Sequence, residues 1–281
     1  MGIQCVRSKR EVKSLYLADC HNHTCCSGDS DAPLELVLQR AARMGLSHVC
    51  TTDHMDLVSR EGDVLEDWDW TAVLEQHERA QQSAPKGVEV RLGAELNSAH
   101  LYTERNRRLI GQVPLDLVVG SVHNTSPKLG GEDFILWQYT DEQTCFRALD
   151  DYFDSLITLS GVDYIDVLAH IPYTLRYMTD RDGIPLSLER YRPQLEVIFT
   201  NLIRRGAGIE VNTNRGKSLA DYRDLLVQYR QMGGEIVTLG TDAHRPEDIG
   251  KGIREAAELL RELGYRYYTV YRRRRPEFIP L

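Results

Sequence analysis

The feature that most constrains the fold of this chain is a regular alternation of short apolar runs with longer segments of helical periodicity. Short β-branched or apolar runs predict buried strands, and apolar residues at three- and four-residue spacing predict amphipathic helices. The predicted strands are LYLADCH (15–21), SHVCTTDH (47–54), VEVRLGAEL (88–96), LDLVVGSVH (115–123), DYIDVLAH (163–170), AGIEVNT (207–213) and GEIVTLGTDAH (234–244). Helices are predicted over 33–44, 70–84, 99–110, 141–160, 187–205, 218–232 and 248–263.

Strand–helix alternation of this kind implies right-handed crossovers and a mainly parallel sheet of the α/β class. Seven such units favour a barrel, and α/β barrels of about this length are routinely single domains. We find no linker, repeat or low-complexity segment, so we treat residues 1–281 as one domain. YRYYTV (265–270) is expected to form a last strand, RDGIP (181–185) a turn, and YRRRRPEFIPL (271–281) a solvated face or tail rather than a nucleic-acid patch.

Composition narrows the class of function. The net charge is −8 and the pI is near 5.6, which argues against a nucleic-acid binder with a broadly basic surface but leaves a small anionic substrate possible. Six scattered cysteines form no C-x-x-C pair, as expected of a reduced, cytoplasmic protein. The start, MGIQCVRSKR, has basic residues but no apolar run behind them, and no run reaches the length of a membrane span, so we expect a soluble, untargeted protein.

Each predicted strand ends in a residue that is able to bind metal. Because parallel barrel strands deliver their C-terminal ends to one rim, residues from distant parts of the sequence converge there. Imidazole and carboxylate are ligands that zinc, iron and manganese accept. The residues are His21, His23, Asp53, His54, Glu95, His123, His170, Glu210, Asp242 and His244.

Taken singly, these residues have simpler interpretations. His170 could be a core histidine, Glu95 could pair with Arg91, and TDAH (241–244) could be a helix N-cap. As a set, their placement at seven strand ends favours a metal cluster. Other residues are expected to take no part: His48, His77 and His100 lie away from strand ends, Cys20 faces away from the two histidines beside it, and Cys25 and Cys26 are not needed as ligands.

The order of these motifs, H-x-H, T-D-H, G-x-E, S-V-H, A-H, E-x-N and D-A-H, resembles the PHP family, named after polymerase and histidinol phosphatase. The resemblance runs from Asp19 to His244. It implies a distorted (β/α)7 barrel that holds up to three divalent metal ions (Zn, Fe or Mn). The GIEVNTN strand and the YYTVYRRRRPEFIPL ending are most similar to the histidinol-phosphatase branch.

The resemblance also implies how the ligands are divided. A first ion would lie between His21, His23, Glu95 and Asp242, and Glu95 would bridge to a second ion held by His123 and His170. Asp29, His54 and His244 would take a third, with Asp31 as the competitor of Asp29. Asp53 and Glu210 are expected to orient ligand histidines. Arg176 and Arg215, in loops after rim strands, and Asn212 are candidate substrate contacts, with Lys217 a weaker one.

The implied reaction is hydrolysis of a phosphate monoester, with L-histidinol phosphate as the expected substrate. Asp242, Glu95 and His244 are the expected catalytic residues, and the leaving oxygen would take its proton from Asp242 or from water at the metals. Two alternatives remain open: a related enzyme acting on nucleotides or nucleic-acid ends, and a non-catalytic, metal-stabilised module like those attached to some DNA polymerases. No stable nucleic-acid partner is expected.

Overall fold

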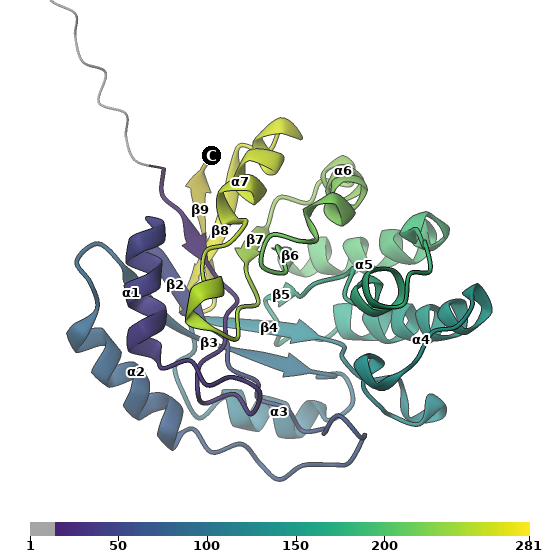
Figure 1. Cartoon of the computed structure of the whole chain (residues 1–281), viewed down its shortest axis with the longest axis horizontal. Coiled ribbons are helices and arrows are strands. Elements are labelled where there is room, and N and C mark those ends of the chain that lie inside the picture. The colour runs from purple at the N-terminus through teal and green to yellow at the C-terminus, as the bar shows by residue number, and fades with distance from the viewer. Residues whose placement is uncertain (1–14) are drawn as a thin grey trace, which may run out of the picture.

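The computed structural model describes residues 15–281, and its centre is a barrel of seven parallel strands that follow one another in chain order (Figure 1). The strands are β1 (Ala18–Asp19), β2 (His48–Thr51), β3 (Glu89–Asn97), β4 (Leu117–Ser121), β5 (Val167–Leu168), β6 (Gly208–Asn212) and β7 (Val237–Gly240). The ring closes between β7 and the segment after β1, where the amides of Cys20 and His23 each donate over 2.8 Å, to Leu239 O and Ala243 O. The expected distorted (β/α)7 barrel is confirmed.

Helices cover the outside of the barrel (Figure 1). They are α1 (Leu34–Met44), α2 (Thr71–Ser83), α3 (Thr103–Ile110), α4 (Glu142–Ser160), α5 (Arg192–Arg205), α6 (Arg223–Gln231) and α7 (Ile253–Glu262). Short 3₁₀ turns are η1 (Pro127–Leu129), η2 (Phe134–Leu136), η4 (Leu188–Tyr191), η5 (Leu219–Tyr222) and η6 (Pro246–Asp248), and η3 (Arg176–Arg181) is a π-helical segment. Each predicted helix is present. As predicted, α1 follows Pro33 and ends at Gly45, whose φ of 74° is left-handed.

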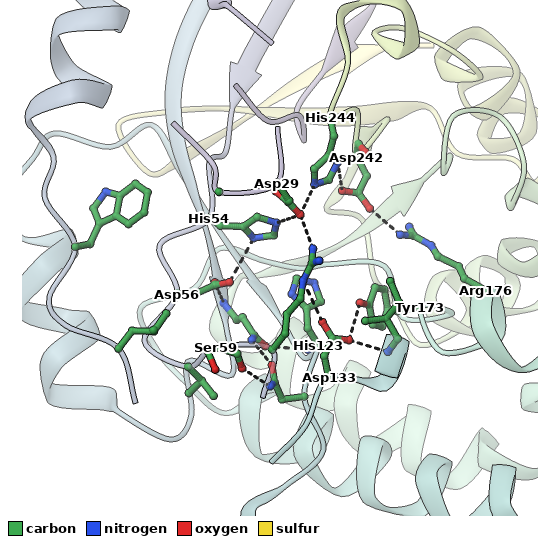
Figure 2. Close-up of a pocket in the computed structure, with 18 of the residues that line it drawn as sticks. Asp29, His54, Asp56, Ser59, His123, Asp133, Tyr173, Arg176, Asp242 and His244 are labelled. Atoms are coloured by element: carbon green, nitrogen blue, oxygen red, sulfur yellow. Dashed lines mark hydrogen bonds and ion pairs between the residues drawn. The ribbon is translucent and has the colours of Figure 1, made fainter. Parts of the chain in front are cut away.

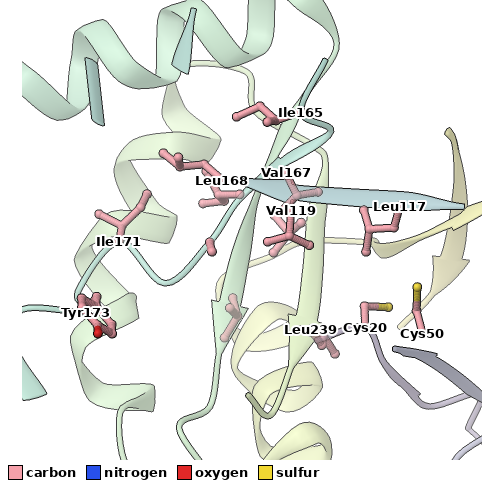
Figure 3. Close-up of a cluster of buried hydrophobic side chains, with 14 of the residues drawn as sticks. Cys20, Cys50, Leu117, Val119, Ile165, Val167, Leu168, Ile171, Tyr173 and Leu239 are labelled. Carbon is pink, nitrogen blue, oxygen red and sulfur yellow. The ribbon is translucent and has the colours of Figure 1, made fainter. Parts of the chain in front are cut away.

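Buried apolar side chains pack on the strands of the barrel (Figure 3). Leu117, Val119, Val167, Leu168 and Leu239 are buried there, with Cys20 and Cys50 beside them. Burial raises the pKa of both thiols well above the ordinary value. Cys20 is buried among these side chains and belongs to none of the candidate ligand groups of the described residues.

The C-terminal segment differs from the prediction. YRYYTV contributes to β8 (Tyr267–Arg272), but the arginine-rich ending is not a solvated tail, because it turns back to form β9 (Arg275–Pro280), antiparallel to β8. The two strands form a separate sheet, the C-terminal hairpin. Its tight turn places Arg273 and Arg274 at positive φ. The prediction for residues 271–281 was wrong because the partners of these arginines lie far away in the sequence.

Those partners lie at the end of the barrel where the strands begin. Arg274 pairs with Asp166, directly before β5, and donates to Tyr164 O over 2.6 Å. Asp116, directly before β4, accepts from the amide of Arg273 over 2.8 Å. The hairpin therefore packs against the N-terminal ends of these strands, opposite the rim.

No helix within residues 15–281 is long and apolar enough to cross a membrane. The expectation about the first ten residues lies outside the described part of the chain.

We predict that Arg274→Ala lowers the free energy of unfolding by about 1–3 kcal/mol, because it leaves the largely buried Asp166 carboxylate and Tyr164 carbonyl without their charged partner. Arg275→Ala is the matched control, since Arg275 is exposed on the same hairpin and its side chain has no ion pair among the described residues. Urea unfolding of both variants measures the difference. Equal stability of the two variants would contradict the anchoring role of Arg274.

Candidate metal centre

The strand ends bring the predicted polar residues together at one rim of the barrel (Figure 2). His21 and His23 follow β1, His54 follows β2, Glu95 lies within β3, His123 follows β4, His170 follows β5, and Asp242 and His244 follow β7. Glu95 is held by its own strand and the others by the loops directly after a strand, so the hydrogen-bonded strands fix their positions. Residues separated by more than 200 positions thus become neighbours.

Glu95 lies at the centre of this cluster, and none of its side chain is exposed. Its Oε2 atom lies 3.2 Å from His21 Nε2 and 3.5 Å from His23 Nε2. Its Oε1 atom lies 3.2 Å from His123 Nε2 and 3.0 Å from His170 Nε2. Oε2 also lies 3.1 Å from His54 Nδ1. Each oxygen of the carboxylate therefore faces a different set of imidazoles, which is the arrangement that a bridging ligand requires.

Asp242 completes the first group. Its Oδ1 atom lies 3.3 Å from His23 Nε2 and 3.8 Å from His21 Nε2. The backbone of Asp242 has a φ of 56°, an uncommon value for a residue with a side chain, and its amide donates to His21 O over 2.8 Å. The closure of the barrel thus holds the backbone of Asp242 in a strained conformation, and this conformation turns the carboxylate toward the histidines.

Asp29 gathers a third group at the mouth of the rim. Its Oδ2 atom lies 3.3 Å from His244 Nε2 and 3.7 Å from His54 Nε2. The ring of His23 stacks on both imidazoles, at centroid distances of 4.1 and 4.3 Å. Asp31, its competitor in the sequence, is exposed, so the geometry favours Asp29.

Several buried polar atoms of the cluster face one another without forming a hydrogen bond. His21 Nε2, His23 Nε2, Glu95 Oε2 and His54 Nδ1 have no hydrogen-bond partner within the described residues. Buried polar atoms normally have a partner, because leaving one unpaired costs about 1–3 kcal/mol. A divalent cation would satisfy these imidazole and carboxylate atoms together, so the residues present fit a metal cluster of the kind that zinc, iron or manganese forms.

Outer hydrogen bonds select which nitrogen of each histidine faces the centre. Glu210 Oε1 lies 2.8 Å from His21 Nδ1, and an ionised carboxylate only accepts, so this nitrogen carries the proton. Ser27 donates to Asp53 Oδ1 over 2.8 Å and accepts from His23 Nδ1 over 3.1 Å. Both arrangements leave Nε2 free to bind a metal. Asp53 therefore orients His23 through Ser27, whereas Glu210 orients His21 by a direct hydrogen bond.

Gly240 provides the space for the first of these contacts. A Cβ atom at this position of β7 would lie 2.2 Å from Glu210 Oε1 and 2.4 Å from His21 Cβ. Only glycine permits the carboxylate and the imidazole to approach each other there.

Mutual electrostatics sets the charge states of the cluster. Burial raises the pKa of Glu95, but His21 and His123 outweigh it and hold this pKa well below the ordinary value. Burial lowers the pKa of His123, but Glu95 outweighs burial and raises this pKa to about 9. Burial and two neighbouring imidazoles lower the pKa of His23 to about 3, which keeps that ring neutral. Ionised carboxylates and neutral imidazoles are the forms that bind divalent ions, so a metal would have to displace a proton from His123.

The cluster opens into a cavity of about 650 Å³ (Figure 2). Arg176 and Arg215 both line it. Arg176 donates to Asp242 Oδ2 and to Asn212 Oδ1, each over 2.8 Å, and begins the π-helical segment η3 instead of lying in a loop as predicted. Arg215 donates to Asn214 Oδ1 over 2.9 Å.

The remaining candidates are placed as follows. Asn212 is buried and its amide is engaged by Arg176 and Glu210, so it supports the arginine and does not line the cavity. Lys217 is exposed and also lies outside the cavity lining. Other side chains lie outside the ligand groups: His48, His77 and His100, together with Cys20 in the core and Cys25 and Cys26, which contact Gln76.

Three functional positions were missed by sequence reasoning. Ser27 bonds a ligand histidine, Asp56 has its Oδ2 atom 3.7 Å from His54 Nδ1, and Arg60 lies 2.9 Å from Asp29 Oδ2. Asp56 stands two residues beyond His54 in TDHMD, a spacing that could have identified it. Ser27 and Arg60 belong to loops in which no periodicity or motif distinguishes them.

Fold and site together define a (β/α)7 barrel with an imidazole–carboxylate cluster on its rim. A protein-family model described as PHP domain matches residues 19–214, which is more than half of the chain. The chain therefore belongs to the PHP family.

Curated relatives match over most of their length. The probable histidinol-phosphatase of Clostridium acetobutylicum is 27% identical over 252 residues, covering 86% of this chain and 91% of the relative. That of Thermotoga maritima is 23% identical, covering 90% and 95%. A crystal structure of histidinol phosphate phosphatase from Lactococcus lactis, complexed with zinc, L-histidinol and phosphate, has a TM-score of 0.80 at 22% identity and covers 94% of this chain and 100% of that one.

We predict that Glu95→Gln lowers the metal content of the purified protein by at least one equivalent and abolishes its activity, because an amide supplies neither the charge nor two equivalent oxygens for a bridge. Glu89→Gln is the matched control, since Glu89 lies on the same strand at the opposite end of the barrel. Elemental analysis of zinc, iron and manganese measures the content. Equal metal loss in both variants would contradict a bridging role for Glu95.

Proposed function

We propose that this protein is a metal-dependent phosphate monoester hydrolase whose substrate is L-histidinol phosphate. The observation that carries the proposal is the Glu95-centred cluster at the floor of a cavity that Arg176 also lines. The names of the curated relatives and the ligands of the Lactococcus lactis structure support the choice of substrate. A cytoplasmic location and the treatment of the chain as one domain stay predictions.

The proposed ligand division follows the three groups. His21, His23, Glu95 and Asp242 would hold one ion, Glu95, His123 and His170 a second, and Asp29, His54 and His244 a third. When bound, such ions would supply Lewis-acid activation of water and neutralisation of phosphate charge. The fully buried Glu95 keeps the first two groups adjacent, and Asp29 and His244 place the third at the cavity mouth.

The side chains of the cavity would bind and orient the phosphate. The Arg176 guanidinium is suited to this task because it presents a planar fork that matches two phosphate oxygens. Its bonds to Asp242 and Asn212 fix its direction before a substrate arrives. Arg215 would provide a second guanidinium in the cavity lining. Preorganised donors of this kind need little rearrangement during the reaction.

Asp242 is the proposed carrier of the proton for the leaving oxygen. Its Oδ1 atom faces the histidines, and its Oδ2 atom points to Arg176, where the phosphate would lie. Arg176 and His23 hold its pKa well below the ordinary value although burial opposes this, so the carboxylate is ionised before the reaction. It would therefore pass on a proton taken from the attacking water.

The charges of the cavity suit a substrate with a cationic organic part. Arg176 bonds to Asp242 at one side of the cavity, whereas Asp56 and Asp133 line it near His123, and Asp133 is 4.0 Å from Arg60 (Figure 2). A phosphate held by the arginines would leave an ammonium or imidazolium group near these carboxylates. This charge separation favours an amino-alcohol phosphate over a sugar phosphate.

Steady-state kinetics tests the proposal. We expect kcat/KM for L-histidinol phosphate to exceed that for nucleoside monophosphates and sugar phosphates by at least 10²-fold, because only the former places a cation opposite Asp133, and a charged hydrogen-bonded contact is worth about 1.5–3 kcal/mol. A higher kcat/KM for a nucleotide would show that L-histidinol phosphate is not the substrate, although the protein would still be a phosphatase. Absence of phosphate release from every ester by fully metal-loaded protein would favour a non-catalytic module.

Arg176→Ala is predicted to lower kcat/KM by about 10²–10³-fold, because it deletes a charged donor from a preorganised site. Arg176→Lys should restore little, since an ammonium lacks the planar fork. Metal content should stay unchanged in both variants. Arg204→Ala, on the exposed face of α5, is the control and should retain full activity. Full activity of Arg176→Ala with metals intact would show that other donors hold the phosphate.

A further inference from the structure

Arg60 lies across the mouth of the cavity, in the loop between β2 and α2. Its Nη2 atom is 2.9 Å from Asp29 Oδ2, and its Nε atom is 4.0 Å from Asp133 Oδ2. Asp29 Oδ2 is also the atom that faces His244 Nε2 at 3.3 Å and His54 Nε2 at 3.7 Å. A permanently charged side chain and two candidate ligands therefore converge on one oxygen.

The backbone around Arg60 is fixed by several contacts, so this position is a property of the fold. The Arg60 carbonyl accepts from the amide of Asp133 over 2.8 Å. The carbonyl of Ser59 accepts from Asn124 Nδ2 over 2.8 Å. Gly62 packs so closely on the neighbouring loop that a Cβ atom there would lie 2.9 Å from Gly131 O. The backbone is anchored, while 53% of the Arg60 side chain remains exposed.

A guanidinium keeps its positive charge at every pH at which a protein is folded. A divalent cation bound by Asp29, His54 and His244 would therefore share the Asp29 carboxylate with a second cation and be repelled by it. The groups around Glu95 are shielded from this effect, because Glu95, His123 and His170 are buried and have no contact with Arg60 among the described residues. Arg60 therefore competes with a cation only at the group formed by Asp29, His54 and His244.

We propose that Arg60 is an internal competitor for the ion held by Asp29, His54 and His244, which makes this ion the weakest and most exchangeable of the three. The inference rests on the proposed function for the division of ligands, but not on the identity of the substrate. Its consequence is regulatory: the two inner ions remain bound, while occupancy of the outer group follows the supply of free metal.

Titration of the metal-free full-length protein with Zn²⁺, in the presence of a chromophoric chelator, tests the proposal. Wild-type protein is expected to bind two equivalents tightly and a third at least tenfold more weakly. Arg60→Ala and Arg60→Gln should tighten the third step by about tenfold, equivalent to 1.4 kcal/mol, and leave the first two unchanged. Arg60→Lys retains the charge and should stay close to wild type.

Arg223→Ala is the matched control, because Arg223 forms an ion pair of the same length, 2.9 Å, with Glu262 and is 54% exposed, but lies on α6. It should bind zinc as the wild type does. The proposal is overturned if the third step is unchanged or weaker in both Arg60→Ala and Arg60→Gln, if all three steps shift together, or if the wild type binds fewer than three ions. Because the measurement contains no substrate, failure of the histidinol-phosphate assignment would leave this result intact.

Discussion

The structure depends on the burial of one charged side chain, the Glu95 carboxylate. Removing an ionised carboxylate from water is costly unless opposite charges and hydrogen bonds surround it. Five histidines approach its two oxygens at 3.0–3.5 Å, and they follow four different strands of the barrel. The barrel must therefore close for this carboxylate to be stable, and the closed barrel places two groups of potential metal ligands side by side.

The need to orient those histidines extends into the loops. The Asp53 carboxylate accepts a hydrogen bond from Ser27, and Ser27 accepts one from His23 Nδ1. Asp53 thus determines the tautomer of the His23 ring without contacting it. The direct contact between Glu210 and His21 requires the missing side chain of Gly240. Positions that appear unremarkable in the sequence thus control the geometry of the cluster. Substitutions at Ser27 or Gly240 would disturb the site without removing any ligand.

The fold and the gathering of the cluster could be predicted from the sequence, because both follow from local patterns and one topological rule. Parallel barrel strands share a rim, so a histidine or an acid at each strand end implies convergence. Contacts that depend on loop conformation could not be predicted. Arg60 reaches Asp29 from a loop in which Gly62 packs closely on Gly131 of another loop. The C-terminal hairpin was missed because the partners of Arg274 lie about 110 residues earlier in the chain.

That hairpin has a consequence for the order in which the chain acquires its structure during synthesis. Proteins emerge from the ribosome N-terminus first, and contacts of high sequence separation form late. Asp116 and Asp166, at the base of the barrel, meet Arg273 and Arg274 only after the seven strands of the barrel have emerged. Until then, the nascent chain lacks the arginine partners of these acids and exposes the apolar surface that β8 covers, and this interval is when it most needs protection from aggregation.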